Sequence, residues 1–253
     1  MLKNYNIILN IGTHGDEKIG LKVANGVKKF HIKNGKVLIN IANKRAFKKN
    51  IRFIDQDLNR SFPGKPNGNY EEKRAHQLLG LVKKADIVLD IHSTTSELKD
   101  ALIVTKLNPP TKECIHAIAP RYALIMNATK NKALISHAKI GIAFEYGKDN
   151  DPKVIKKVTD GIRCLLIHLD MLKKPHNNKL KNKTVYFNVT KSVPKPKDAI
   201  LAKQIKNYLL IKKGQVYART KEREIRATRD FYPILFGNKN YEDIFGFQAS
   251  RIA

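Results

Sequence analysis

The sequence predicts an α/β fold built around a mainly parallel sheet. Residues 5–11 and 36–42 are short apolar runs, which are typical of strands buried on both faces. Between these runs, apolar residues recur at helical spacing, with lysines on the other side, at Ile19, Val23, Val27 and Phe30. A strand, a helix and a strand in such quick succession imply a right-handed crossover between parallel strands.

The same patterns continue along the chain. Further buried strands are predicted at residues 85–91, 101–105, 121–126 and 141–147. Helices are predicted at residues 70–84 and from Pro152 to about Leu172, because proline is favoured in the first turn of a helix. A Pro109-Pro110 turn and a short helical piece separate two of the strands, and residues 43–68 are irregular.

A polar segment divides the chain. Residues 173–183 (KKPHNNKLKNK) are rich in lysine and asparagine, and the hydrophobic period changes after them. Val185, Phe187 and Val189 alternate with polar residues, and turn residues recur further on. We therefore expect an α/β domain at residues 1–174, followed by a small antiparallel β domain at residues 183–253.

The composition is that of a globular protein with a strong positive charge. Forty-nine lysines and arginines oppose 22 acidic residues, which gives a net charge of +27 over 253 residues. The basic residues are spread along the chain and form no basic arm, so a solvated lysine-rich surface is favoured over nucleic-acid binding. The positive field would also concentrate a carboxylate substrate.

Location and redox state follow from other features of the sequence. No apolar run approaches the ~20 residues needed to span a bilayer, and the N-terminus lacks a signal-peptide core, so a cytoplasmic location is expected. Cys114 and Cys164 lie in ordinary apolar settings without Cys-x-x-Cys spacing, which favours buried thiols over a disulfide or a metal clip.

The run Gly12-Thr13-His14-Gly15-Asp16-Glu17 directly follows the first apolar stretch. His14 and Glu17 offer one nitrogen and one oxygen donor, and a catalytic zinc commonly takes three protein ligands. His92 ends the strand predicted at residues 85–91, and ligands gather at the carboxyl ends of parallel strands. We predict a metal site at His14, Glu17 and His92. Asp90 and His92 are two residues apart, so Asp90 is expected on the same side of the strand as His92, where its carboxylate can orient the His92 imidazole.

Two further segments carry polar residues with open interpretations. Arg52 and Arg60 flank an acidic, polar stretch, which suits carboxylate recognition but also an ordinary surface loop with internal arginine–aspartate pairs. Glu145 stands in a small, apolar, glycine-bounded strand, where an unpaired carboxylate is costly. It is either a paired structural acid or a general base with a shifted pKa.

Five motifs together resemble the aspartoacylase and succinylglutamate desuccinylase family, relatives of the zinc carboxypeptidases. The resemblance covers nearly the whole chain. It implies a three-layer α/β/α sandwich of the zinc-carboxypeptidase type with a mixed, mainly parallel sheet, followed by the small β domain. The motifs are the Gly12–Glu17 run, Asp57-Leu58-Asn59-Arg60, Asp90-Ile91-His92-Ser93-Thr94-Thr95, Phe144-Glu145-Tyr146-Gly147, and the segment from Phe231-Tyr232-Pro233 to Tyr241.

The resemblance implies a role for each matching residue. His14, Glu17 and His92 match the family's zinc ligands, one ion per chain, and Glu145 matches the acid that activates the water. Arg52 matches the arginine that polarises the scissile carbonyl. Asn59 and Arg60 match the pair that holds the substrate carboxylate. Tyr241 matches the tyrosine that closes the pocket.

The sequence also departs from the family's pattern. Asp16 stands where the family more often has an asparagine. This position is not one of the expected metal ligands. Ile135 stands where aspartoacylases have a second carboxylate-binding arginine, and nearby Lys132, His137 and Lys139 are not convincing replacements. This departure leaves the acyl-aspartate specificity open.

The sequence therefore predicts a zinc-dependent amidohydrolase acting on a small anionic N-acyl amino acid or a similar carboxylated amide. One alternative is a zinc carboxypeptidase acting on short peptides or cell-wall fragments. An alternative of another class is a basic nucleic-acid-binding protein with a non-catalytic metal site, which has no need for Glu145 beside a metal.

Overall fold

The computed structural model describes residues 4–94, 100–128, 131–173 and 183–252. Its helices are α1 (Ile19–Val27), α2 (Lys44–Lys49), α3 (Tyr70–Lys84), α4 (Pro109–Ile118) and α5 (Pro152–His168), with short 3-10 turns η1 (Leu58–Arg60) and η2 (Leu134–His137). Its strands are β1 (Asn6–Ile11), β2 (Lys36–Ile41), β3 (Ile87–His92), β4 (Ala101–Val104), β5 (Tyr122–Met126), β6 (Ile140–Glu145), β7 (Val185–Pro194), β8 (Ile200–Leu201), β9 (Val216–Arg219), β10 (Glu224–Arg226), β11 (Tyr232–Ile234) and β12 (Ile244–Ile252).

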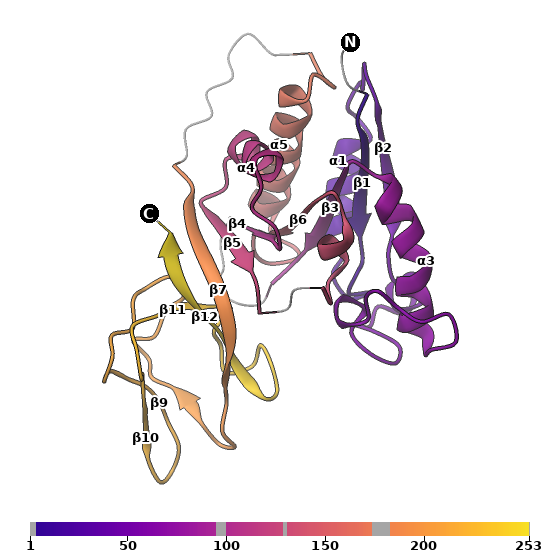
Figure 1. The fold of residues 1–253 in the computed structure, drawn as a ribbon. Helices are drawn as coiled ribbons and strands as arrows, with labels where there is room; N and C mark the ends of the chain where they lie inside the picture. The colour runs from indigo at the N-terminus through magenta and orange to yellow at the C-terminus, as the bar shows by residue number, and fades with distance from the viewer. Residues whose placement is uncertain (1–3, 95–99, 129–130, 174–182, 253) are drawn as a thin grey trace.

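The predicted α/β architecture with a mainly parallel mixed sheet is confirmed. Nine strands form one sheet in the order β11-β12-β7-β5-β4-β6-β3-β1-β2 (Figure 1). β1 pairs in parallel with β2 and β3, and β3 pairs in parallel with β6. β4 runs antiparallel to β6 but parallel to β5, which makes the sheet mixed.

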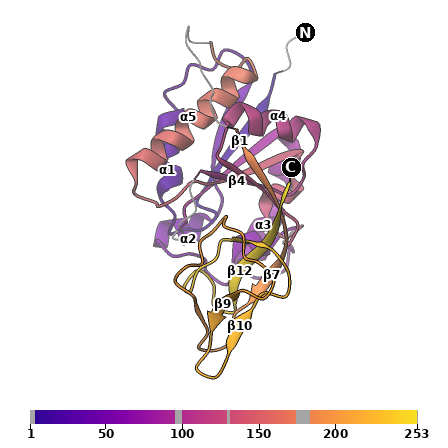
Figure 2. The ribbon, with the colours of Figure 1, turned by 90° about the vertical axis from the view of Figure 1, so that its left-hand side faces the viewer.

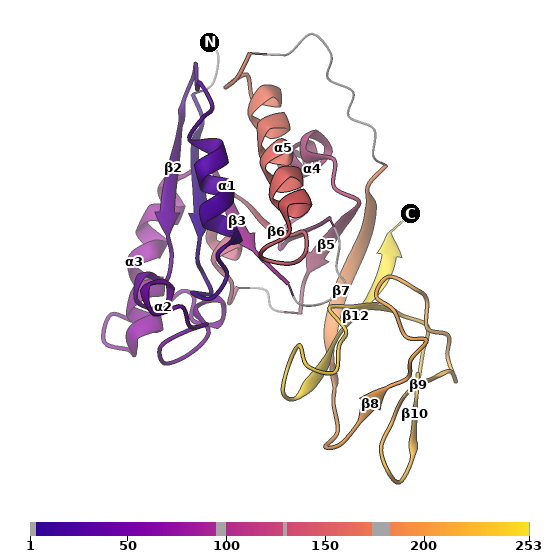
Figure 3. The same ribbon diagram turned by 180° about the vertical axis from the view of Figure 1, so that it is seen from behind.

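Helices cover both faces of the sheet and bury two apolar clusters. α1, α4 and α5 lie together on one face, as Figure 3 shows from behind, and α3 lies on the other. The alternation along β1 divides its side chains between these clusters. Ile7, Leu9 and Ile11 pack under α1 and α5, while Ile8 packs under α3 with Leu78. β1 and β3 read as continuous apolar runs because both of their faces are covered. The prediction that the run at residues 36–42 is buried on both faces was wrong, because β2 is the edge strand of the sheet and its residues are exposed or half-buried.

Several boundaries differ from the sequence prediction for local reasons. Pro109 begins α4, with Asn108 as its cap, because proline fits the first turn of a helix. α5 ends at His168, and the chain reverses at Asp170, whose φ is +56°. α2 was not predicted, because six residues are too few to show a helical period.

The C-terminal part continues the main sheet and adds a small antiparallel sheet. β7 pairs in parallel with β5 and antiparallel with β12, so β7, β12 and β11 extend the nine-stranded sheet. The separate sheet has three strands in the order β10-β9-β8 and lies at the end away from α4 and α5 (Figure 2). Most of the polar segment 173–183 lies outside the described residues. The division into two domains stays a prediction.

In the ranges that the structure describes, no helix is long and apolar enough to span a bilayer. Cys114 is buried, as the sequence predicted, whereas Cys164 is half-buried, and the two thiols are not joined in a disulfide.

Candidate active site

Two neighbouring strands bring the predicted metal ligands to one edge of the sheet. His14 follows β1, His92 ends β3, and these strands are adjacent and parallel. One ligand atom from each of His14, Glu17 and His92 lies within 4.8 Å of the others, and all three side chains are buried. Glu17 joins the imidazoles, since its two oxygens lie 2.7 Å from His14 Nδ1 and 3.0 Å from His92 Nδ1.

The glycines that flank His14 allow the loop after β1 to turn tightly. Gly12 has a φ of +61°, in the left-handed region that favours glycine. At Gly15 a Cβ would come within 2.1 Å of the backbone of Ala46, and the Gly15 N–H donates to the Arg52 carbonyl at 3.1 Å. The loop that carries His14 is therefore packed directly against α2 and the segment containing Arg52.

A carboxylate contacts the far nitrogen of each imidazole. Asp90 Oδ2 lies 2.9 Å from His92 Nε2, and its other oxygen accepts hydrogen bonds from Asn10 and Thr13, both at 2.8 Å. Asp57 Oδ1 lies 3.1 Å from His14 Nε2. Each Nε2 is thus engaged with a carboxylate while each Nδ1 faces Glu17. In this arrangement the Nδ1 atoms are the ones that could bind a metal ion.

The buried charges shift one another's pKa values. Burial disfavours the charged imidazolium, but Asp90 and Glu17 raise the pKa of His92 well above its usual value. His14 shows the same balance, with its pKa raised by Glu17 and Asp57. Burial also disfavours ionised Glu17, yet the two imidazoles hold its pKa below the usual range. These compensating pairs stabilise a compact polar cluster inside an otherwise apolar sheet.

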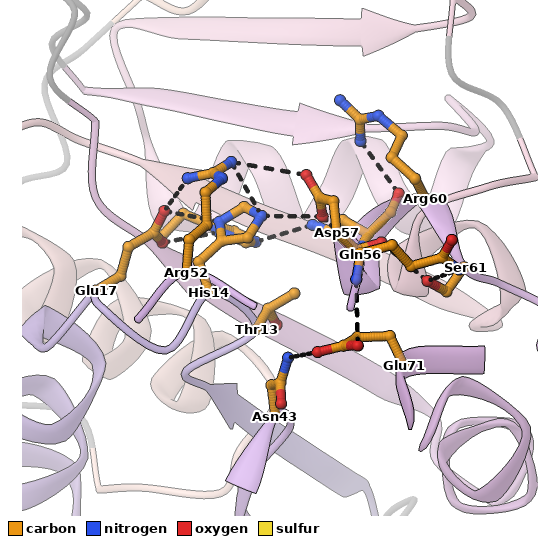
Figure 4. A network of polar contacts seen from close by, with 12 residues as sticks. Thr13, His14, Glu17, Asn43, Arg52, Gln56, Asp57, Arg60, Ser61 and Glu71 are labelled. Carbon is orange, nitrogen blue, oxygen red and sulfur yellow. Dashed lines mark hydrogen bonds and ion pairs between the residues drawn. The ribbon is translucent and has the colours of Figure 1, made fainter. Parts of the chain in front are cut away.

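Arg52 lies over this cluster (Figure 4). Its guanidinium Nη2 is 3.2 Å from His14 Nε2 and 3.7 Å from Asp57 Oδ2, and its Nη1 is 3.7 Å from Glu17 Oε1. The side chain is 48% exposed, so it reaches the site from the solvent side. Arg52 thus faces Asp57, as the loop with internal arginine–aspartate pairs predicts, and it also borders the ligand cluster, while carboxylate recognition by this segment stays a prediction.

A buried glutamate shapes the segment that carries Arg52, Asp57, Asn59 and Arg60. Glu71, in the first turn of α3, has no solvent exposure. Its Oε1 accepts from the Ile54 N–H at 2.7 Å and from Asn43 Nδ2 at 3.0 Å. Its Oε2 accepts from the Asp55 N–H at 2.9 Å and from the Gln56 N–H at 3.3 Å. Figure 4 shows the contacts of Glu71 with Asn43 and Gln56. One carboxylate therefore fixes three successive peptide groups just before Asp57.

Asn59 and Arg60 are oriented differently. The Asn59 Oδ1 accepts from the Leu134 N–H at 3.2 Å, and its Nδ2 lies 3.3 Å from His92 Nε2. Arg60 is exposed, and its Nη1 donates to the Asn59 carbonyl at 3.1 Å. Asn59 is thus engaged within the protein, while most of the Arg60 guanidinium is available to a ligand.

A cavity of about 330 Å³ joins these residues to Glu145 and Tyr241. Glu145 ends β6 in register with His92 of β3, so its carboxylate borders the ligand cluster. Burial raises the pKa of Glu145 to about 7, with nearby Glu17 adding to the rise and His92 opposing it. Tyr241, between β11 and β12, reaches the same cavity, and burial raises its pKa to about 12. The structure thus brings all the predicted site residues to one place.

Some residues of the site were not identified from the sequence. Asp57 was noted only as part of a motif, and Asn10, Thr13 and Glu71 were not singled out. Their contacts join residues separated by 15 to 80 positions, which no local pattern reveals. For Glu71, the one available signal is an acid in the first turn of a helix, and that signal is also typical of ordinary helix starts.

Comparison with known families decides the relationship. Residues 4–168 match the succinylglutamate desuccinylase/aspartoacylase catalytic domain. The chain belongs to this family. The matched range contains the ligand cluster, the segment anchored by Glu71, and Glu145.

Two similar proteins of described function share about a quarter and about a third of their aligned residues with this chain. The chain is 25% identical over 189 residues to an N-acyl-aromatic-L-amino acid amidohydrolase of Xenopus tropicalis, a match that covers 63% of this chain and 61% of that protein. It is 35% identical over 120 residues to a probable aspartoacylase of Acaryochloris marina, covering 41% and 39% of the two chains. The matches therefore span less than two thirds of the length of either relative.

Solved structures confirm the fold over almost the whole chain. Murine aminoacylase 3 superposes with a TM-score of 0.80 at 18% identity, covering 98% of this chain and 95% of that one. A succinylglutamate desuccinylase/aspartoacylase from Rhodobacter sphaeroides superposes with a TM-score of 0.78 at 17% identity, covering 99% and 87%.

One position departs from the pattern expected of aspartoacylases. Ile135, on η2, is buried and lines the cavity. The neighbouring basic residues do not take the place of the arginine that aspartoacylases have at this position. Lys132 is exposed, His137 Nε2 lies 3.0 Å from the Asn131 carbonyl oxygen, and Lys139 pairs with Asp86 at 3.4 Å. None of these three lines the cavity.

Proposed function

We propose that this chain is a zinc-dependent deacylase that cleaves the amide bond of an N-acyl amino acid or a similar small carboxylated amide. The observation that carries the proposal is the placement of Glu145 on the same cavity as the donor atoms of His14, Glu17 and His92. Membership of the desuccinylase/aspartoacylase family supports amide hydrolysis. The relatives named for N-acyl amino acid hydrolysis support the substrate class.

The donor set fits zinc. Two imidazole nitrogens and one carboxylate oxygen form a common ligand set for a catalytic zinc that keeps a fourth position open. The contacts of Asp57 and Asp90 with the far nitrogens of the two imidazoles are the support that metal-ligating histidines usually have. Bound there, zinc would lower the pKa of a water molecule to about 7 and polarise a carbonyl group.

Glu145 and Arg52 would carry the proton transfer and the charge stabilisation. Glu145 lies on the cavity beside the ligand cluster, where it can accept a proton from the attacking water and return it to the leaving amine. The Arg52 guanidinium, beside His14, can stabilise the negative charge that develops on the carbonyl oxygen. Removing one such donor typically raises the barrier by about 2.7–4 kcal/mol.

Arg60 would bind the substrate carboxylate. Its guanidinium is a planar fork that matches a carboxylate, and it lies on the cavity with most of its donors unused by the described residues. Asn59, held by Leu134 and next to His92, fixes the start of the Arg60 side chain relative to the ligand cluster. This positioning would make the attack effectively unimolecular.

Hydrolysis of N-acetylglycine and N-acetylmethionine by zinc-loaded protein tests the proposal. Amine release is measured for the wild type and for Glu145→Gln, with zinc content determined on the same samples. We expect turnover by the wild type and its loss in Glu145→Gln at unchanged zinc content. Cleavage of short peptides with no cleavage of acyl amino acids would instead indicate a carboxypeptidase. Salt-sensitive nucleic-acid binding without any hydrolysis would overturn the enzyme assignment.

A further inference from the structure

The lining of the cavity contains two kinds of residue. Its polar part includes the ligand cluster, Arg52, Arg60 and Glu145, and Asn240 and Tyr241 follow in the loop after β11. Its apolar part, called the apolar wall below, consists of Ile103, Met126, Ile135, Leu235 and Phe247. Mostly apolar pockets with a few convergent polar groups are typical of small-molecule sites, where the polar groups set orientation and the apolar wall selects the substrate.

The apolar wall begins directly beside Glu145. Ala143 and Glu145 are two residues apart on β6, so their side chains share a face of the sheet. Ile103 of β4 pairs with Ala143 and continues this face. Met126, Leu235 and Phe247 belong to one buried cluster, against which Ile103 packs. Ile103, Met126 and Phe247 therefore come from strands of the main sheet, while Leu235 directly follows β11 and Ile135 lies on η2.

The positive charges on the cavity suffice for one carboxylate. Among the described lining residues, the lysine and arginine side chains are those of Arg52 and Arg60. Arg52 already faces Glu17 and Asp57, which leaves Arg60 for a carboxylate of the substrate. A second carboxylate placed on the apolar wall would lose its hydration without gaining a cation, which is costly.

We propose that this wall binds an apolar branch of the substrate, so that the enzyme prefers N-acyl amino acids with a single carboxylate and an apolar group. This inference rests on the deacylase function proposed above. The apolar branch is either the amino-acid side chain or the acyl chain, because both leave the scissile amide within reach of Glu145. A substrate with more than one carboxylate, such as N-acetylaspartate with two or N-succinylglutamate with three, is discriminated against.

A substrate panel with zinc-loaded wild-type protein tests the preference. N-acetylphenylalanine carries the apolar side chain, N-hexanoylglycine carries the apolar acyl chain, and N-acetylglycine carries neither. We expect kcat/KM for one of the first two to exceed that for N-acetylglycine by about tenfold or more, and that for N-acetylaspartate by about 100-fold. The better of the two identifies which branch lies on the wall.

The variants Met126→Gln and Met126→Leu test the wall itself. Met126→Gln should lower kcat/KM for the preferred apolar substrate about tenfold, because a polar amide then lies against the apolar branch. Met126→Leu keeps the apolar surface and should retain the preference. Ligand binding gives a readout that needs neither turnover nor a folded variant. We expect 3-phenylpropanoate to raise the Tm of metal-free wild-type protein more than succinate does at equal concentration.

The outcomes separate this inference from the proposed function. Hydrolysis of N-acetylglycine with an equal or higher kcat/KM for N-acetylaspartate would overturn the apolar preference and leave the deacylase function standing. A larger Tm shift with succinate would also overturn it. No hydrolysis of any acyl amino acid would overturn the proposed function itself.

Discussion

Replacement of Glu71 by glutamine tests how the segment that carries Arg52, Asp57 and Arg60 is held in place. The Glu71 carboxylate accepts four hydrogen bonds, two on each oxygen. In Glu71→Gln one oxygen still accepts two of them, but the amide NH2 group faces two N–H donors. Hydrogen bonds to a charged group contribute about 1.5–3 kcal/mol each, so the free energy of unfolding should fall by about 3–6 kcal/mol.

The adjacent Glu72 offers a matched control. Its carboxylate accepts from the Asn69 N–H at 3.0 Å and pairs with Lys65 at 2.9 Å, partly exposed to solvent. Glu72→Gln keeps an acceptor for Asn69 and loses a surface ion pair, so its cost should be about 1 kcal/mol or less. Urea unfolding gives both values, and kinetics on an acyl amino acid should show a raised KM for Glu71→Gln alone. Equal stability and equal KM for the two variants would refute the reasoning.

Three further predictions concern the site. Glu145→Gln should retain zinc and lower kcat by about 10²–10⁴-fold, so an unchanged kcat would show that Glu145 is not the base. Arg60→Ala should raise KM for carboxylated substrates with kcat near the wild-type value, whereas an effect on kcat alone would argue against a binding role. Asp90→Asn should weaken zinc affinity about 10–100-fold in competition with a chromophoric chelator, because His92 Nε2 then faces a neutral amide instead of a carboxylate. An affinity equal to that of the wild type would contradict this.

The sheet could be predicted from the sequence because its strands are continuous apolar runs. β1, β2, β3 and β6 all lie where such runs occur. Helices cover both faces of β1 and β3, whereas β2 lies at the edge of the sheet and leaves Leu38 48% exposed. The pairing partners could not be predicted in the same way. Alternation around Phe187 predicted a strand of an antiparallel β region, but β7 also pairs in parallel with β5 and joins the main sheet. Local pattern shows which face is buried, and tertiary packing decides the neighbour.

The site residues, like the strands, could be predicted from the sequence only in part. His14 and His92 could be placed together because each stands at the carboxyl end of a buried strand. The contacts of Asp57 with His14 and of Glu71 with the peptide groups after Phe53 could not be anticipated, because they depend on how a long loop folds back. The apolar wall was equally hidden, since Met126 and Phe247 read as ordinary core residues until the sheet brings them to the cavity.

The central claim is that His14, Glu17 and His92 hold one zinc ion. Elemental analysis of the wild type and of His92→Ala, after loading with zinc and exhaustive dialysis, tests it most directly. We expect about one zinc per wild-type chain and less than about a tenth of that in the variant, because a ligand atom is lost. A wild-type chain that retains no zinc, or a variant that retains as much as the wild type, would contradict the account.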